Sequence, residues 1–128
     1  MPARILVIDD DLASLELMTY LLQAFGHTLL CAGDDEEGLE AIGREGPDLV
    51  ICDVHLPKID GYEVARQLKG HPTWRTIPLV AVTASAMAHD RSKALAAGFD
   101  GYLTKPINPE TFVQQIEAFL AVRESKSE

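Results

Sequence analysis

Hydrophobic residues lie along this chain in short unbroken runs, separated by longer segments of mixed character. The run Leu49–Cys52 is too short for a helix and follows the turn residues Gly46 and Pro47. An uninterrupted apolar run of this length is typical of a parallel strand covered on both faces. Four further runs also predict strands, so that five are expected: Arg4–Ile8, Thr28–Ala32, Leu49–Cys52, 77–82 and 101–103.

The segments between the strands predict five helices. In the first, residues 12–25, apolar side chains recur at steps of three and four residues, at Leu15, Met18, Leu22 and Phe25. Asp11 is its expected N-cap and Gly26 its expected C-terminal stop. The second helix is expected from Asp34 or Asp35 to about Gly43, and the third is a short helix after Gly61 that Gly70, His71 and Pro72 end. The fourth is expected from 85 to 97 before Gly98, and the fifth from an Asn108 N-cap with Pro109 at the first helical position.

Strands and helices that alternate along a chain predict an α/β fold. We expect a doubly wound (βα)5 arrangement, in which a parallel five-stranded sheet carries helices on both faces. The 128 residues suffice for one domain, with a core over 4–122 and a frayed polar tail over 123–128. No residues remain after the fifth helix for an output domain, so a single domain over 1–128 is expected.

Composition narrows the classes of function. The net charge of −9 argues against direct binding to nucleic acid or to an anionic membrane, since phosphate groups favour a basic protein surface. No apolar run approaches the length of a membrane span, and the first strand begins too early for a signal peptide. A cytoplasmic protein is therefore expected, with Cys31 and Cys52 as small buried thiols in a reducing compartment.

Polar side chains stand at the carboxyl ends of four predicted strands. Asp9 and Asp10 follow the first strand, and Asp53 follows the third. Thr83 follows the fourth strand, and Lys105 lies just after the fifth. The carboxyl ends of parallel strands lie on one edge of the sheet, so these groups converge if their strands are neighbours.

This set of groups suits phosphoryl transfer. Carboxylate oxygens at high local negative charge favour Mg²⁺, and a carboxylate nucleophile can form an acyl phosphate. A metal ion, an ammonium and a hydroxyl are the groups that stabilise the charge on a transferring phosphoryl group. Structural alternatives stay open for each residue. Residues 9–11 can cap the following helix, Asp53 can cap a turn, Lys105 can be a solvated side chain, and Thr83 can bond its own backbone.

Four motifs together resemble the receiver domains of response regulators in two-component signalling. They are ILVIDDD, DLVICDVHLPKIDGYE, IPLVAVTASAM and AGFDGYLTKPI, and the resemblance extends over residues 5–120. It implies a flavodoxin-like three-layer sandwich with the strand order 2-1-3-4-5.

The resemblance implies a role for each matching residue. Asp53 would be the phosphoacceptor. Asp10, Asp53 and the backbone carbonyl of His55 would bind Mg²⁺, with Mn²⁺ as an alternative ion, and Asp9 would act partly through water. Lys105 would pair with the phosphoryl oxygens.

The resemblance also implies a switch. Thr83 would hydrogen-bond the phosphoryl group, and Tyr102 matches the aromatic residue whose rotamer couples to that threonine. A doubly charged group beside Thr83 would pull the hydroxyl inward and vacate space that Tyr102 can fill. The face formed by the fourth helix, the fifth strand and the fifth helix would then change and bind a downstream protein. The Lys105–Pro106 peptide bond is often cis in relatives.

The partners implied by the resemblance are proteins. A histidine kinase or a histidine phosphotransfer protein would be the phosphodonor. The chain would be a monomer or a phosphorylation-dependent dimer. It would catalyse only its own phosphorylation and hydrolysis, so no external substrate is expected.

Three alternatives stand beside this interpretation. The segments AVTASAM and YLTKPI also resemble receivers attached to hybrid histidine kinases, so the chain can be such a domain excised from a longer protein. A phosphatase with an Asp nucleophile is disfavoured, because His55 stands where such enzymes place a second carboxylate and no residues are left for a substrate cap. A phosphorylation-independent interaction module is disfavoured because every site position holds a competent residue.

Overall fold

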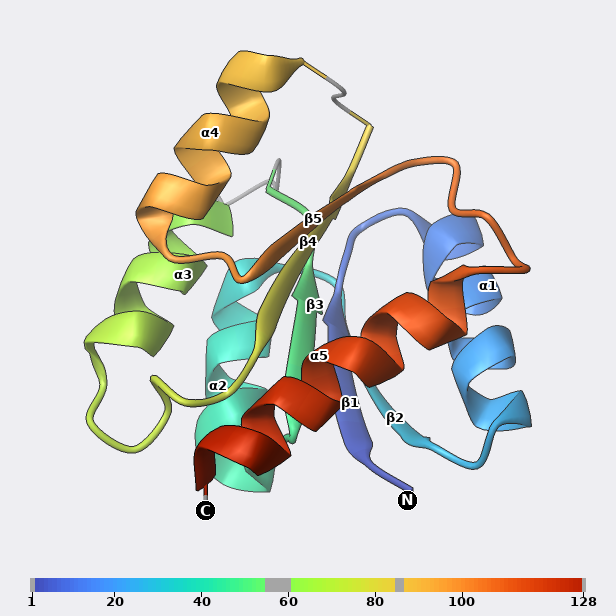
Figure 1. Cartoon of the computed structure of the whole chain (residues 1–128), viewed down its shortest axis with the longest axis horizontal. Coiled ribbons are helices and arrows are strands. Elements are labelled where there is room, and N and C mark those ends of the chain that lie inside the picture. The colour runs from blue at the N-terminus through green and yellow to red at the C-terminus, as the bar shows by residue number, and fades with distance from the viewer. Residues whose placement is uncertain (1, 55–60, 85–86, 128) are drawn as a thin grey trace.

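Five parallel strands form the centre of the molecule, as Figure 1 shows for the computed structural model. The structure describes residues 2–54, 61–84 and 87–127, with side chains up to residue 121. The strands are β1 (Arg4–Ile8), β2 (Thr28–Ala32), β3 (Leu49–Cys52), β4 (Leu79–Thr83) and β5 (Gly101–Thr104). They lie in the order β2-β1-β3-β4-β5, and every neighbouring pair is parallel. The predicted fold class and strand order are confirmed.

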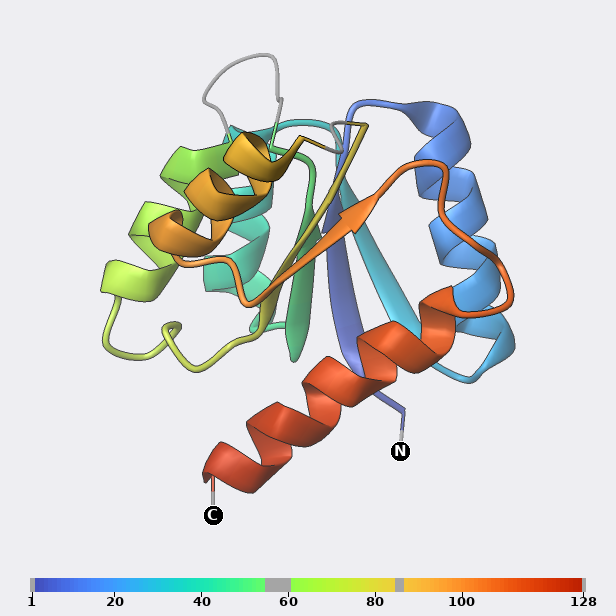
Figure 2. The same cartoon turned by 45° about the horizontal axis from the view of Figure 1, so that its top comes forward.

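Helices cover both faces of the sheet, so the molecule has three layers (Figure 2). One face is covered by α1 (Leu12–Ala24) and α5 (Phe112–Ser127), and the other by α2 (Asp35–Glu45), α3 (Gly61–Gly70) and α4 (Ala88–Ala97). None of the helices in the described parts of the chain is long and apolar enough to cross a membrane.

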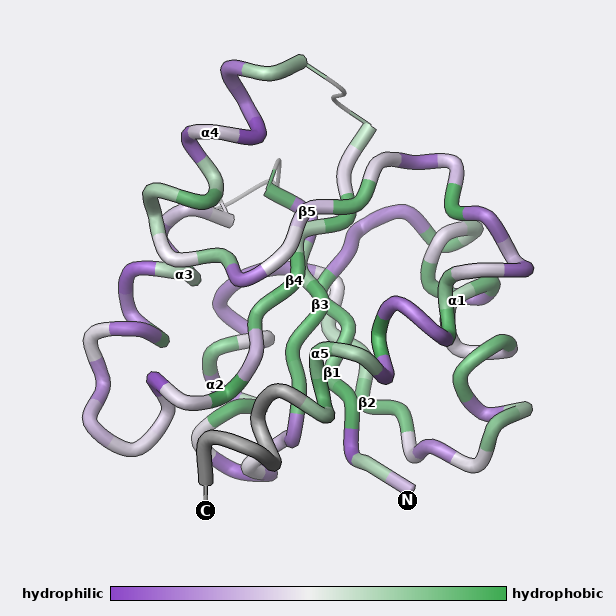
Figure 3. The backbone as a smooth tube through the Cα atoms, in the orientation of Figure 1, coloured by the Kyte–Doolittle hydropathy of each residue, from purple (hydrophilic) through white to green (hydrophobic). Residues whose placement is uncertain are grey.

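Each face of the sheet has its own hydrophobic core. Ile5 and Val7 pack with α1 and α5, whereas Leu6 and Ile8 pack with α2 and α3. Successive side chains of a strand point to opposite faces, so an apolar strand such as β1 supplies both cores. In Figure 3 the central strands accordingly have the hydrophobic colour along most of their length.

Two helix boundaries follow from capping residues. Asp11 caps α1, because its carboxylate accepts a hydrogen bond from the backbone amide of Ala13 at 3.2 Å. Asp34 caps α2 in the same way, accepting from the amide of Glu37 at 2.8 Å. The predicted end of α2 near Gly43 is two residues too early, because Gly46 takes the left-handed conformation that stops the helix.

Other boundaries also differ from those predicted. Strand β4 begins at Leu79 rather than residue 77, since Pro78 has no amide hydrogen and the amide of Ile77 bonds within the preceding turn. Helix α5 begins at Phe112, because Asn108 accepts backbone hydrogen bonds that form a turn before the helix. The backbone over 123–127 is helical, whereas a frayed tail was expected. Helix α4 begins at Ala88, and residues 85 and 86 of its predicted range lie outside the described residues.

The two cysteines differ in exposure. Cys52 is fully buried in β3, as predicted, but Cys31 is exposed. The prediction for Cys31 is wrong because β2 is an edge strand, which lacks a neighbouring strand on one side.

Candidate functional site

Backbone hydrogen bonds extend the strand ladder past the strand ends and fix the residues that follow. The amide of Asp53 donates to the carbonyl of Ile8 at 3.0 Å, which places Asp53 beside Asp9. The amide of Lys105 donates to the carbonyl of Thr83 at 2.8 Å. Four strands therefore deliver polar side chains to one edge of the sheet, as the sequence predicted.

Three carboxylates lie together at this edge. The side chains of Asp9, Asp10 and Asp53 each offer an oxygen within 4.8 Å of the others. Asp9 and Asp53 are buried, with 1% and 8% of their surface exposed, whereas Asp10 is exposed to solvent. A close group of carboxylate oxygens with one open side has the donor chemistry that a hard divalent cation requires. The residues therefore fit a magnesium ion.

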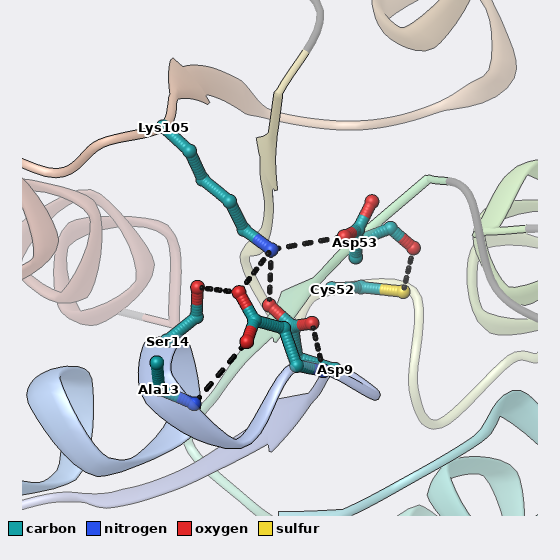
Figure 4. Close-up of polar contacts among 7 residues, drawn as sticks. Asp9, Ala13, Ser14, Cys52, Asp53 and Lys105 are labelled. Atoms are coloured by element: carbon teal, nitrogen blue, oxygen red, sulfur yellow. Dashed lines mark hydrogen bonds and ion pairs between the residues drawn. The ribbon is translucent and has the colours of Figure 1, made fainter.

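Lys105 extends across the site and contacts the carboxylates (Figure 4). Its Nζ lies 2.9 Å from Oδ2 of Asp9 and 3.1 Å from Oδ2 of Asp53. A third carboxylate, that of Asp11, lies 4.0 Å away. One ammonium thus faces several carboxylates, and the site keeps an excess of negative charge. The alternative of a solvated Lys105 is excluded by these contacts.

Burial and ion pairing shift the pKa values in opposite directions. Burial raises the pKa of Asp9, and the hydrogen bonds from Lys105 and from the amide of Asp11 offset this only in part. For Lys105, burial lowers the pKa, but hydrogen bonds to Asp9 and Asp53 outweigh burial and leave the pKa raised. Lys105 is therefore an ammonium at neutral pH.

The three consecutive acids have different roles. Asp11 is the helix cap, because its carboxylate accepts from the amide of Ala13 and from the hydroxyl of Ser14 at 2.8 Å. The hydroxyl of Ser14 is the main reason why the pKa of Asp11 is lowered. Asp9 accepts from the amide of Asp11 at 2.9 Å and faces Lys105 with its other oxygen. Capping therefore explains Asp11 but not Asp9 or Asp10.

The side chain of Thr83 is buried at the same edge of the sheet. It is fully buried, and among the described residues its Oγ1 has no hydrogen-bond partner. Its hydroxyl does not bond its own backbone, which was the structural alternative. A buried hydroxyl without a partner is destabilising, so Thr83 is suited to donate to a group that arrives beside it.

Tyr102 lies in the core on the α3 and α4 side of the sheet and is 6% exposed. The guanidinium carbon of Arg91 on α4 lies 5.9 Å from the centre of its ring. The expected movement of Tyr102 on phosphorylation stays a prediction. The Lys105–Pro106 bond is cis. His55 lies outside the described residues, so its expected carbonyl contact stays a prediction.

Two groups that contact the backbone of Asp53 were not predicted from the sequence. The thiol of Cys52 donates to the carbonyl of Asp53 at 3.3 Å. Burial, followed by the nearby carboxylates of Asp53, Asp9 and Asp35, raises the pKa of this thiol well above its usual value, so it remains a donor. Gly61 approaches the backbone so closely that a Cβ there would lie 2.6 Å from the carbonyl oxygen of Asp53. Neither contact leaves a local signal in the sequence.

The chain matches the family model of the response regulator receiver domain over residues 5–117. The polar-differentiation response regulator DivK of Brucella anthropi is 32% identical over 120 residues, which cover 94% of this chain and 98% of DivK. The alkaline phosphatase synthesis transcriptional regulatory protein PhoP of Bacillus subtilis is 37% identical over 94% of this chain. The chain spans about half of that relative, 49% of its length.

Solved structures show the same architecture. A putative response regulator from Chloroflexus aurantiacus has a TM-score of 0.90 at 34% identity, covering 94% of this chain and 99% of that one. The BeF3-activated receiver domain of DrrB has a TM-score of 0.85 at 31% identity, with coverage of 94% and 99%. The signal receiver domain of a histidine kinase from Syntrophus aciditrophicus has a TM-score of 0.85 at 29% identity, with coverage of 93% and 90%.

Proposed function

The chain belongs to the response regulator receiver domain family, and from this premise we propose that it accepts a phosphoryl group onto Asp53 in a Mg²⁺-dependent reaction. The observation that carries the proposal is the convergence of Asp9, Asp10, Asp53 and Lys105 beside the unpartnered hydroxyl of Thr83. A relative that covers nearly the same length, DivK, supports a signalling role rather than turnover of an external substrate.

The transfer step uses groups that are already in place. An oxygen of Asp53 attacks the phosphorus of a phosphohistidine, and the bond from phosphorus to the imidazole nitrogen breaks. Its electron pair stays on that nitrogen, which the partner's imidazole retains. Lys105, 3.1 Å from Asp53, would then pair with a phosphoryl oxygen, and the hydroxyl of Thr83 would donate to another.

The residues that would hold the metal are Asp10, Asp53 and the carbonyl of His55, with Asp9 acting partly through water. Mg²⁺ bound there would neutralise part of the charge on the transferring group, and Mn²⁺ suits the same oxygen ligands. Hydrolysis reverses the modification: water attacks the phosphorus and the Asp53–phosphorus bond breaks, which restores the carboxylate. The chain's own chemistry is thus limited to gaining and losing one phosphoryl group.

The proposed partners are a phosphohistidine protein upstream and a protein target downstream. A histidine kinase or a histidine phosphotransfer protein would supply the phosphoryl group, and the α4–β5–α5 face would carry the response. DivK and the Chloroflexus protein, which the chain covers almost completely, are relatives of the length of one receiver domain. The resemblance to a receiver of a histidine kinase keeps the excised-domain alternative open.

Intact mass spectrometry after incubation with acetyl phosphate and Mg²⁺ tests the proposal. Wild type is expected to gain the mass of a single phosphoryl group, and the gain is expected to disappear with a chelator or in Asp53→Asn. The control is Asp34→Asn, which removes a carboxylate outside the site and keeps a side chain that can cap α2. An adduct that persists in Asp53→Asn would contradict the assignment. A folded wild type without an adduct would favour the phosphorylation-independent interaction module.

A further inference from the structure

Asp35 is a buried carboxylate that the proposed function does not use. It is 0% exposed, and neither of its oxygens has a hydrogen-bond partner among the described residues. A buried carboxylate without partners is costly, whether it is charged or neutral. The helix does not require it, because Asp34 is the cap and Glu36 and Glu37 place negative charge in the same turn at the surface.

Helix α2 packs on the sheet in such a way that Asp35 lies at the same edge of the sheet as the site. Gly38 packs directly on β1, since a Cβ at that position would lie 2.7 Å from Cγ1 of Ile8. Residues three apart share one face of a helix, and side chains of a helix tilt toward its N-terminus. Asp35 therefore lies one turn beyond Ile8, toward the edge where Asp9 follows β1.

A second observation places Asp35 near the site. Cys52, which pairs with Ile8 across β1 and β3, precedes Asp53 and points into the core that α2 covers. Its thiol experiences the negative charges of Asp53, Asp9 and Asp35 together. Asp35 and the carboxylates of Asp9 and Asp53 thus lie near the same thiol, with Asp35 on the α2 side of the sheet.

We propose that Asp35 is a positioning residue for the cation site, whose buried carboxylate increases the affinity of Asp9, Asp10 and Asp53 for Mg²⁺. The ammonium of Lys105 already faces three carboxylates, so it does not balance a further negative charge. In an interior of low dielectric, a nearby carboxylate strengthens cation binding without touching the ion. Groups that hydrogen-bond the direct ligands typically change metal affinity by about 10- to 100-fold, and we expect an effect at the lower end for Asp35, which acts through its charge alone. This inference rests on the proposed Mg²⁺-dependent function.

Calorimetric titration with MgCl2 alone tests the inference without any phosphorylation. Asp35→Asn is expected to bind Mg²⁺ about 10-fold more weakly than wild type. The matched control is Asp34→Asn, which removes the same charge one residue earlier, where the side chain is only half-buried and caps the helix. It is expected to bind Mg²⁺ with nearly the affinity of wild type. Circular dichroism confirms that each variant is folded.

The outcomes separate the inference from the function on which it rests. Equal Mg²⁺ affinities of wild type and folded Asp35→Asn would overturn the role of Asp35, while phosphorylation of Asp53 would stand. A wild type that binds no Mg²⁺ would overturn the Mg²⁺-dependent function itself. If Asp35→Asn does not fold, Asp35→Ser provides a smaller uncharged side chain, and the same loss of affinity is expected. Unchanged affinity in that variant would equally reject the inference.

Discussion

Burial and hydrogen bonding separate three neighbouring acids that have the same chemistry. Asp9 is buried and faces Lys105, Asp10 is exposed, and Asp11 caps α1. Burial destabilises the ionised form of Asp9, so the pKa of Asp9 is raised even though the ammonium of Lys105 lies 2.9 Å away. The site therefore contains a carboxylate whose charge destabilises the metal-free fold, as expected of a site that binds cations.

The raised pKa of Asp9 predicts how stability depends on pH. Between the usual pKa of 3.8 and the raised value, the folded state binds more protons than the unfolded state, so this contribution to stability is lost as the pH rises. Asp9→Asn, which stays neutral, is expected to be about 1 kcal/mol more stable than wild type at pH 7 without metal. The difference should shrink as the pH falls toward about 4. Urea unfolding in the presence of a chelator measures both the difference in stability at pH 7 and its decrease at lower pH.

Asp10→Asn is the control for this comparison, because Asp10 is exposed and its charge remains hydrated. It is expected to change the free energy of unfolding by less than about 0.5 kcal/mol. A wild type that is more stable than Asp9→Asn at pH 7 would mean that the ion pair with Lys105 outweighs burial.

At the scale of elements, glycine residues allow helices to pack closely against the strands that carry the site. Helix α3 begins at Gly61, whose amide donates to the carbonyl of Val54 at 2.9 Å. A Cβ at this position would lie 2.6 Å from both the carbonyl oxygen of Asp53 and Cα of Val54. These are backbone atoms, which cannot move aside without shifting the strand end. The position of α3 and the position of Asp53 are thus coupled.

Gly61→Ala is therefore expected to affect both stability and phosphorylation. We expect a loss of about 1–3 kcal/mol in the free energy of unfolding, because the added methyl group overpacks the junction. Phosphorylation by acetyl phosphate should also slow, since Asp53 is displaced. The control is Gly70→Ala at the other end of α3, where an added Cβ would meet no described atom within 4 Å. A wild-type rate of phosphorylation in Gly61→Ala would show that the position of Asp53 does not depend on how α3 packs.

Elements that depend on local chemistry were predictable from the sequence, and contacts between distant segments were not. The apolar runs located all five strands, and Asp11 and Gly98 marked helix ends correctly. The order of the strands placed Asp53 and Lys105 together, 3.1 Å apart. The burial of Asp35 and the close approach of Gly61 depend on how α2 and α3 seat on the sheet, which periodicity does not reveal. Asn108 was predicted to cap the last helix, but its side chain accepts a hydrogen bond within the turn that precedes α5. The start of this helix was therefore predicted too early.

At the scale of the whole molecule, a bound cation couples to folding by mass action. The carboxylates of Asp9, Asp10 and Asp53 follow two separate strands and converge only in the folded chain. Mg²⁺ at about 100 times its dissociation constant is therefore expected to stabilise the fold by about 2.7 kcal/mol. Thermal unfolding with and without Mg²⁺ measures this gain, which should be smaller in Asp53→Asn. A gain of equal size in that variant would place the ion elsewhere.

The proposed route from the site to the distant face passes through few residues. Thr83 ends β4 and pairs in register with Thr104 of β5, and Tyr102 lies on the same strand under Arg91 of α4. We propose that a phosphoryl contact to Thr83 acts on this packing and shifts the population of states of the α4–β5–α5 face. The dependence of this shift on Thr83 distinguishes this route from a general electrostatic effect.

Thr83→Ala is expected to separate events at the site from events at the face. With Mg²⁺ and beryllofluoride as a phosphoryl mimic, amide spectra of wild type should change near Asp53 and also along α4, β5 and α5. In Thr83→Ala the changes near Asp53 should remain, because the carboxylates and Lys105 are intact, while those along the face should largely vanish. Thr104→Ala, which removes an exposed hydroxyl at the paired position, is expected to behave like wild type. Undiminished changes at the face in Thr83→Ala would mean that the added charge reaches α4 without this hydroxyl.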